Sequence, residues 1–399
     1  MDAGGTGRPV FDGVQALLTS IRELSRRPNF YTRGSEKGVR GDQPLPIICL
    51  QGTPVGNEFM DALNARLDEP DERQIPHVLV DVETAQESAK ARWASGVHDF
   101  PLIPLLDELS AGISGKKIRG HRSLTQFNRY RLANWLTGQQ LEPSEEKRGR
   151  AKIVQLLRAW VNRDPVVDPE TTHDVVQAVP VGNVGVRAAI VACRFALSRW
   201  LSERVPGLRQ ERRWLMRQPF MVPQHSAGFL GFAERLTAGY RSSENDDQVR
   251  KLLVHAFLED LRHKYRRPWF RGFPNRKGSR HTAYFVLLLQ NVSEENGGWE
   301  FLTLLNAVRN ETGEPDPLLV VASSDDQARL SAAFQATGPY AAANIESALA
   351  RWRETLPTQR QLLAENARYL PIVLPAKTTA PADVHQLAPG DQNPVGRLR

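Results

Sequence analysis

Hydrophobic positions along the chain follow two patterns, one typical of buried strands and one typical of helices. Continuous apolar runs bounded by turn residues predict strands that are buried on both faces of a parallel sheet. These runs are LPIICLQ (45–51), PHVLVDV (76–82), AYFVLLLQ (283–290), PLLVVAS (317–323) and YLPIVLP (369–375).

Apolar residues at helical spacing predict helices in the segments between these runs. Segments 11–26, 58–67 and 298–310 alternate with the strands, whereas the long stretch between the second and third strands is helical throughout, with predicted helices near 101–113, 122–137, 150–161, 185–205, 226–241 and 247–266. Alternation of strands and helices predicts an α/β fold. We therefore expect a three-layer core with a five-stranded parallel sheet, interrupted by a large all-helical insert.

The same patterns divide the chain into parts. Residues 1–42 hold an N-terminal helix and a linker, and residues 43–95 and 281–388 form the predicted α/β core. Residues 96–280 form the helical insert, and residues 389–399 are expected to be a disordered tail.

Composition narrows the class of protein. The chain has 399 residues, of which 41% are hydrophobic and 24% charged, as in ordinary folded proteins. This excludes a collagen-like or wholly disordered chain, and the net charge of +7 does not by itself imply nucleic acid. Two cysteines, no signal-peptide pattern and no long apolar tract predict a cytoplasmic protein that does not enter a membrane.

Candidate chemistry gathers at the carboxyl ends of the predicted strands, where parallel α/β sheets place their sites. The first strand runs into GTPVGNEF (52–59), a glycine-containing turn that leads into a helix. The third strand ends at Gln290 and Asn291, and the fourth ends at Ser323. Asp81 and Glu83 follow the second strand, either as acids that face the crevice or as the cap of a following helix.

This order of parts resembles the P-loop NTPases, in the branch related to the AAA+ and STAND ATPases of bacteria with GC-rich genomes. In that family the first strand runs into a glycine-rich loop, the third ends in the acidic Walker B motif and the fourth in a polar sensor residue. The resemblance covers residues 45–90 and 281–390. A β–turn–helix unit of another α/β fold is the alternative explanation of residues 45–59.

The glycine-rich loop departs from the family's pattern G-x-x-x-x-G-K-[ST], in which the lysine contacts phosphates and the hydroxyl holds Mg²⁺. With Gly52 as the first glycine, Asn57 replaces the second glycine, Glu58 the lysine and Phe59 the hydroxyl. In a loop shorter by one residue, Gly56 is the second glycine, Asn57 replaces the lysine and Glu58 replaces the hydroxyl. Both registers lose the lysine and the hydroxyl.

The magnesium anchor is also altered. Gln290 stands where the family has the Walker B aspartate, and an amide brings no negative charge to a hard cation. Asn291 follows it, Glu294 and Glu295 could supply a displaced carboxylate, and Ser323 occupies the sensor-like position. The resemblance therefore predicts a catalytically inactive member that needs no cofactor, with ATP and Mg²⁺ bound only if displaced residues substitute.

We expect a scaffold or regulatory subunit in a multi-protein bacterial assembly of the signalling or defence type. Its expected partner is another protein, and a related active ATPase is one candidate. A weak nucleotide-binding NTPase that uses displaced residues is one alternative. A nucleic-acid-binding module is another, because residues 262–280 interleave basic and aromatic side chains. Its candidate contacts are Arg266, Arg267, Trp269, Arg271, Arg276 and Lys277. The competing interpretation of that stretch is a solvated loop.

Overall fold

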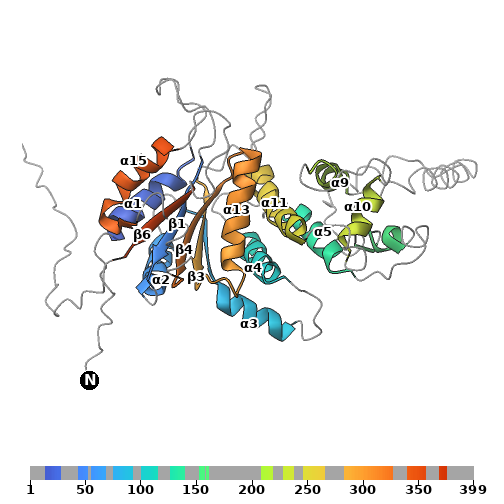
Figure 1. Cartoon of the computed structure of the whole chain (residues 1–399), viewed down its shortest axis with the longest axis horizontal. Helices are drawn as coiled ribbons and strands as arrows, with labels where there is room; N and C mark the ends of the chain where they lie inside the picture. The colour runs from blue at the N-terminus through green and yellow to red at the C-terminus, as the bar shows by residue number, and fades with distance from the viewer. Residues whose placement is uncertain are drawn as a thin grey trace, which may run out of the picture.

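The chain forms a parallel sheet with helices on both faces, seen in the computed structural model in Figure 1. The structure describes residues 14–27, 44–52, 55–68, 75–92, 100–115, 126–139, 152–157, 159–160, 208–218, 228–237, 246–265, 283–326, 339–355 and 368–374.

The sheet has six strands in the order β2-β3-β4-β1-β6-β5, and every neighbouring pair is parallel. The strands are β1 (Ile47–Gln51), β2 (His77–Asp81), β3 (Phe285–Gln290), β4 (Leu318–Ser324), β5 (Tyr340–Ala341) and β6 (Tyr369–Val373). β3 and β4 are buried at every position, as expected of strands covered on both faces. The five predicted strands and the α/β class are confirmed.

The predicted number of five strands is wrong by one edge strand. β5 has two residues and pairs with Ile372 and Val373 of β6. A strand of this length carries no periodicity, so its position depends on the neighbouring strand and not on a pattern in its own sequence.

Three helices cover one face of the sheet: α1 (Val14–Ser25), α2 (Val55–Asp68) and α15 (Ile345–Thr355). Because side chains alternate along a strand, Ile48 and Leu50 of β1 point to this face and pack in one apolar cluster with Phe59 of α2. Leu17 and Ile21 of α1 are fully buried in the same cluster. The N-terminal helix therefore packs directly on the core.

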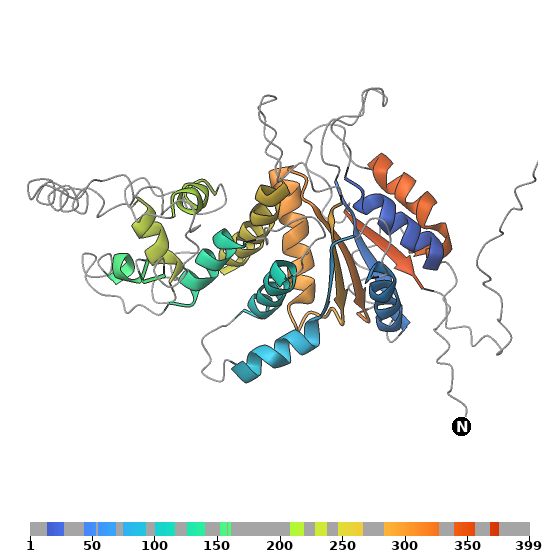
Figure 2. The same ribbon diagram turned by 180° about the vertical axis from the view of Figure 1, so that it is seen from behind.

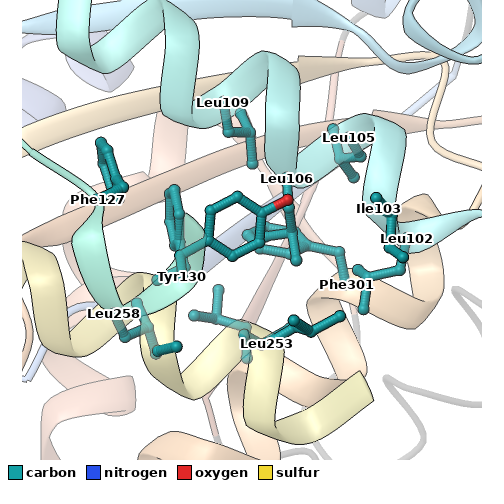
Figure 3. Close-up of a cluster of buried hydrophobic side chains, with 14 of the residues drawn as sticks. Leu102, Ile103, Leu105, Leu106, Leu109, Phe127, Tyr130, Leu253, Leu258 and Phe301 are labelled. Carbon is teal, nitrogen blue, oxygen red and sulfur yellow. The ribbon is translucent and has the colours of Figure 1, made fainter. Parts of the chain in front are cut away.

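The opposite face is covered by α4 (Leu102–Gly115), α11 (Asp246–Tyr265) and α13 (Gly298–Thr312), as the reverse view in Figure 2 shows. Their apolar side chains meet in a cluster in which Tyr130 lies at the centre (Figure 3). Side chains are buried around most of the circumference of α11. This helix packs against α13 on the side of the sheet and against α5 (Asn128–Thr137) on the side of the helical insert. Helices α4 and α11 thus belong to the core layer and to the insert at once.

Every element that the structure describes between β2 and β3 is helical, as predicted for the insert. Helix α3 (Val82–Arg92) follows β2 directly, and α9 (Arg209–Leu215) and α10 (Gly228–Leu236) lie beyond α11 from the sheet in both views. Within the described residues, no helix is both long and apolar enough for a bilayer crossing. The predicted helix 185–205 and the predicted tail 389–399 lie outside the described residues.

A carboxylate of α11 fixes the start of α5 against that helix, within the residues predicted as the insert. Asp260 accepts hydrogen bonds from the backbone N–H groups of Arg129 and Tyr130, at 2.9 and 3.0 Å, in the first turn of α5. It also accepts a 2.7 Å bond from the guanidinium of Arg129. The residue before α5, Phe127, makes no side-chain capping hydrogen bond. Asp260 therefore satisfies the backbone N–H groups that the start of a helix leaves without a partner.

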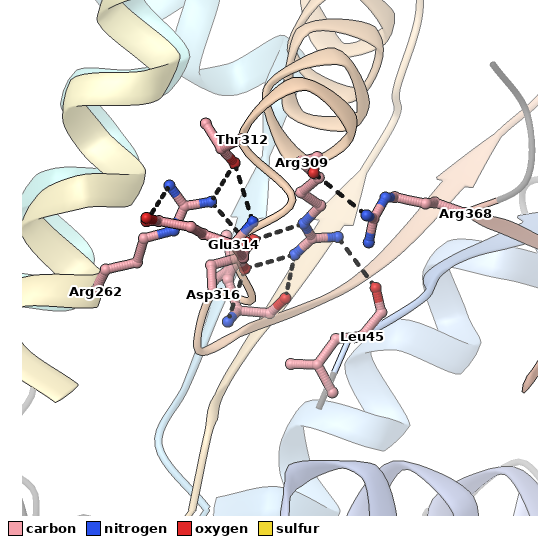
Figure 4. Close-up of polar contacts among 8 residues, drawn as sticks. Leu45, Arg262, Arg309, Thr312, Glu314, Asp316 and Arg368 are labelled. Atoms are coloured by element: carbon pink, nitrogen blue, oxygen red, sulfur yellow. Dashed lines mark hydrogen bonds and ion pairs between the residues drawn. The ribbon is translucent and has the colours of Figure 1, made fainter. Parts of the chain in front are cut away.

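At the amino edge of the sheet, a buried arginine joins three segments (Figure 4). Arg309, near the end of α13, donates to both carboxylate oxygens of Asp316 at 2.7 Å. It also donates to the backbone carbonyls of Leu45 and Leu318, at 3.3 and 2.5 Å. Arg368, just before β6, donates to the carbonyl of Arg309 at 3.3 Å. This contact set fixes the starts of β1, β4 and β6 relative to the end of α13.

Candidate functional site

The carboxyl ends of β1, β3 and β4 lie side by side, because β4 pairs with both β1 and β3. The residues that follow these strands therefore converge on one place, although Gly52 and Ser323 are far apart in the sequence. Parallel α/β sheets bind ligands at such a crevice.

The turn after β1 is short. Gly52 has a φ of 97°, a conformation that favours glycine, and α2 already begins at Val55. The N–H of Gly56 donates a 2.6 Å hydrogen bond to the carbonyl of Gly52, which is the spacing of a helical turn. Gly56 is thus part of the helix, and its N–H group is engaged within the chain.

Asn57 is the centre of the contacts in the crevice. Its amide nitrogen Nδ2 donates to Oδ1 of Asn291 at 2.6 Å, and its Oδ1 accepts a 3.0 Å bond from the hydroxyl of Ser323. Its backbone carbonyl accepts a 3.0 Å bond from Nε2 of Gln290. Four of the residues predicted from the sequence therefore meet in one hydrogen-bonded group.

Two carboxylates complete this group. Asp61, one turn beyond Asn57 on α2, accepts a 2.9 Å bond from Nε2 of Gln290. Asp81, at the end of β2, accepts a 2.9 Å bond from Nδ2 of Asn291. We call these six residues the crevice network: Asn57, Asp61, Asp81, Gln290, Asn291 and Ser323.

Asp81 also caps the helix that follows it. Its Oδ1 accepts hydrogen bonds from the backbone N–H groups of Glu83 and Thr84, at 3.0 and 3.3 Å. These are the groups that an N-cap carboxylate satisfies, so the capping interpretation of this strand end is confirmed. Glu83 is exposed on the first turn of α3.

The loop after β3 is tied to β4 as well as to α2 and β2. The N–H of Val292 donates to the carbonyl of Ser323 at 2.9 Å, and the hydroxyl of Ser324 donates to the carbonyl of Val292 at 2.6 Å. Glu294 and Glu295, the candidates for a displaced carboxylate, are exposed on this loop, whereas Gln290 is buried.

The side chains of the crevice network are either uncharged or negatively charged. Its amides and hydroxyl bring no charge, and its two aspartates already accept amide hydrogen bonds. Among the described residues, no lysine or arginine forms an ion pair or hydrogen bond with any of the six side chains. Glu58, the next residue of α2, is half-buried and adds a third carboxylate near the start of that helix.

The other candidate residues lie elsewhere. Arg266, Arg267, Trp269, Arg271, Arg276 and Lys277 of the nucleic-acid hypothesis fall outside the described residues. Cys49 is a free thiol inside β1, where burial raises its pKa, so it is not poised as a nucleophile. The described residues contain no group of three or more histidine, cysteine or acidic side chains with the placement of a metal site.

Sequence reasoning missed Asp61. Its signal was available, because residues four apart share one face of a helix, which places Asp61 beside Asn57. The donation from Gln290 to Asp61 has no such local signal, since it joins β3 to α2 across the sheet.

Comparison with known proteins adds no family. No protein-family model matches the chain, and no curated protein matches it.

Proposed function

We propose that this protein is a catalytically inactive relative of the P-loop NTPases that acts as a scaffold or regulatory subunit in a multi-protein assembly. The observation that carries the proposal is the crevice network. At the place where the family would bind a triphosphate, the side chains of Asn57, Asn291 and Ser323 satisfy one another.

The contacts of Asn57 favour one of the two registers of the loop. Asn57 lies between the residues assigned to the Walker B and sensor positions. A lysine that reaches nucleotide phosphates would need this location. In this register Asn57 replaces the lysine, Gly56 is the second glycine and Glu58 replaces the hydroxyl.

Electrostatics oppose nucleotide binding in this register. A polyphosphate would meet the carboxylates of Asp61, Asp81 and Glu58, and no lysine stands at the loop position where the family has one. Juxtaposed like charges cost several kcal/mol. Since about 1.4 kcal/mol is a factor of ten in affinity, binding would weaken a hundredfold or more. The nucleotide would also have to break the existing network, in which each neutral hydrogen bond contributes about 0.5–1.5 kcal/mol.

Magnesium lacks the anchor that the resemblance assigns to it, because Gln290 stands at the position of the Walker B aspartate. Gln290 offers an amide, and its Nε2 is directed to Asp61 and to the carbonyl of Asn57. Its Oε1 can coordinate a cation but brings no negative charge, unlike the aspartate that it replaces. Glu294 and Glu295, the candidates for a displaced carboxylate, are exposed on the loop, whereas Gln290 is buried. This placement does not favour either glutamate as the magnesium ligand.

A fold of this kind survives the loss of site residues, because apolar burial on the two faces of the sheet holds it together. The surface of the fold and the helical insert then remain as the parts that can bind a partner. The proposed ligand is a partner protein, and an active ATPase of related fold is the first candidate. The resemblance to bacterial signalling and defence ATPases directs this choice.

The test measures turnover and assembly on the full chain. Phosphate release from Mg-ATP is expected to equal the buffer blank and to be unchanged in Asn57→Ala. Purification from the native host is expected to yield a complex of constant stoichiometry, with or without added nucleotide. A chain that purifies alone and releases phosphate in an Asn57-dependent manner would contradict the proposal.

A further inference from the structure

The backbone of Asn291 is unusual. It is the one residue other than glycine, among those the structure describes, that has a positive φ, at 55°. Asparagine tolerates this left-handed conformation better than most residues, but it persists at functional positions when the surroundings hold it in place.

Contacts on three sides hold Asn291. Its side chain accepts from Asn57 at 2.6 Å and donates to Asp81 at 2.9 Å, so it joins the start of α2 to the end of β2. Its backbone carbonyl accepts a 2.6 Å bond from Nδ2 of Asn296, further along the same loop. A change in any of these contacts removes part of what fixes the left-handed backbone.

The loop 291–297 continues into the helical part of the chain. The carbonyl of Asn296 accepts a 2.9 Å bond from Nε2 of Gln86 in α3, and the same amide group donates to the carbonyl of Pro101 at the start of α4. Gly297 lies so close to this start that a Cβ there would be 2.7 Å from the carbonyl carbon of Pro101. The loop therefore touches the crevice on one side and two helices on the other.

We propose that Asn291 is a conformational latch that couples the crevice to the helices α3 and α4. When Asn57 is drawn away by a partner, Asn291 loses its bond to Asn57, its left-handed backbone relaxes and loop 291–297 moves off Gln86 and Pro101. This inference rests on the proposed function in one respect only, namely that a partner protein and not a nucleotide acts on the chain; contact of that partner with Asn57 is part of the inference itself.

Hydrogen exchange of the full chain, without nucleotide, tests the latch. Asn57→Ala cuts the bond to Asn291 but touches neither α3 nor α4. We expect amide exchange in residues 82–92 and 100–106 to rise about fivefold or more, as for local opening of a coupled unit. Asn64→Ala, on the same helix and outside the crevice network, is the matched control and is expected to leave both stretches unchanged.

A second background separates coupling from general loosening. Asn291→Gly keeps the left-handed backbone accessible but removes both side-chain bonds, so Asn57→Ala in this background is expected to add nothing at α3 or α4. If Asn57→Ala melts below the working temperature, Asn57→Asp, which lacks the Nδ2 donor to Asn291, replaces it. Unchanged exchange in α3 and α4 for both variants, or an equal effect in the Asn291→Gly background, overturns the latch. Binding of Mg-ATP would overturn the proposed function and leave this result standing.

Discussion

Arg309 and Asp316 form a buried ion pair in which two guanidinium nitrogens, Nε and one terminal nitrogen, each meet a separate carboxylate oxygen at 2.7 Å (Figure 4). Both side chains are 2% exposed, so each charge depends on the other for compensation. Burial acts to raise the pKa of Asp316, but the attraction and hydrogen bonds of Arg309, together with Arg262 and the N–H of Leu318, outweigh it and hold the pKa below its usual value.

Asp316→Asn should therefore be strongly destabilising. It leaves Arg309 buried without its counter-charge, which costs about 3–5 kcal/mol when one partner of a buried pair is removed. Chemical denaturation of the two proteins measures the loss. Glu314→Gln on the same loop is the control, because Glu314 is 56% exposed and its change should stay within about 0.5 kcal/mol. Equal losses in the two variants would contradict the assigned role of the pair.

Acid should destabilise the protein through His255. Burial lowers its pKa to about 3, with smaller effects of Arg262 and Lys251. An unfolded histidine titrates near 6.5, so stability from this group is present above about pH 6.5 and is lost as pH falls toward 3. The slope is at most about 1.4 kcal/mol per pH unit in this window.

Unfolding free energies measured between pH 7.5 and 4 check this prediction. Relative to the unmutated protein, His255→Phe should reduce the stability that is lost between about pH 6.5 and 4, whereas His263→Phe, at an exposed position of the same helix, should not. A pH dependence that is unchanged by His255→Phe would show that other groups cause the acid sensitivity.

Gly297→Ala should destabilise the loop after β3. Its φ is 75°, and a Cβ would meet the Pro101 backbone at 2.7 Å. A strained backbone of this kind costs about 1–3 kcal/mol, visible as a lower melting temperature. Gly115→Ala at the end of α4 is the matched control, since a Cβ there meets nothing within 4 Å and should be neutral or stabilising. A neutral Gly297→Ala would contradict the close approach of this loop to α4.

A single charge restored to the loop should not restore catalysis. Glu58→Lys and Asn57→Lys each add a cation, but both variants keep Gln290 and lack the hydroxyl that would hold Mg²⁺. Phosphate release is expected to stay at the buffer blank in both variants. An active P-loop ATPase assayed in parallel establishes the sensitivity, and turnover in either variant would show that the motif assignment is wrong.

The sheet was predictable because its strands are apolar on both faces. β3, for example, is a continuous apolar run that ends at Gln290 and is buried at every position. Helix α3 was predicted only as a helix that Asp81 caps, without bounds, because few apolar residues anchor it: among its described side chains Val82, Ala85 and Ala89 are the buried ones. Helix α15 was not predicted, although buried Ile345, Ala348, Leu349 and Trp352 have helical spacing. Their positions follow from the core that they cover and from the cap at Asp81.

The sequence predicted which residues belong to the candidate site, but it did not predict how their side chains contact one another. Strand ends in a parallel sheet must converge, so Asn57, Gln290, Asn291 and Ser323 could be grouped before their contacts were known. That Asn57 bonds to Asn291 and Ser323, and that Asp61 accepts from Gln290, depends on side-chain directions across three strands. Local sequence carries no information about such long-range pairs.

Equilibrium binding of a fluorescent ATP analogue in the presence of Mg²⁺ tests the central claim most directly. If the crevice is filled by its own amides and lacks a cation, titration should show no saturation up to about 1 mM, which corresponds to a binding free energy weaker than about −4 kcal/mol. Saturable binding near 1 μM, about −8 kcal/mol, that is lost in Asn57→Ala would contradict the account.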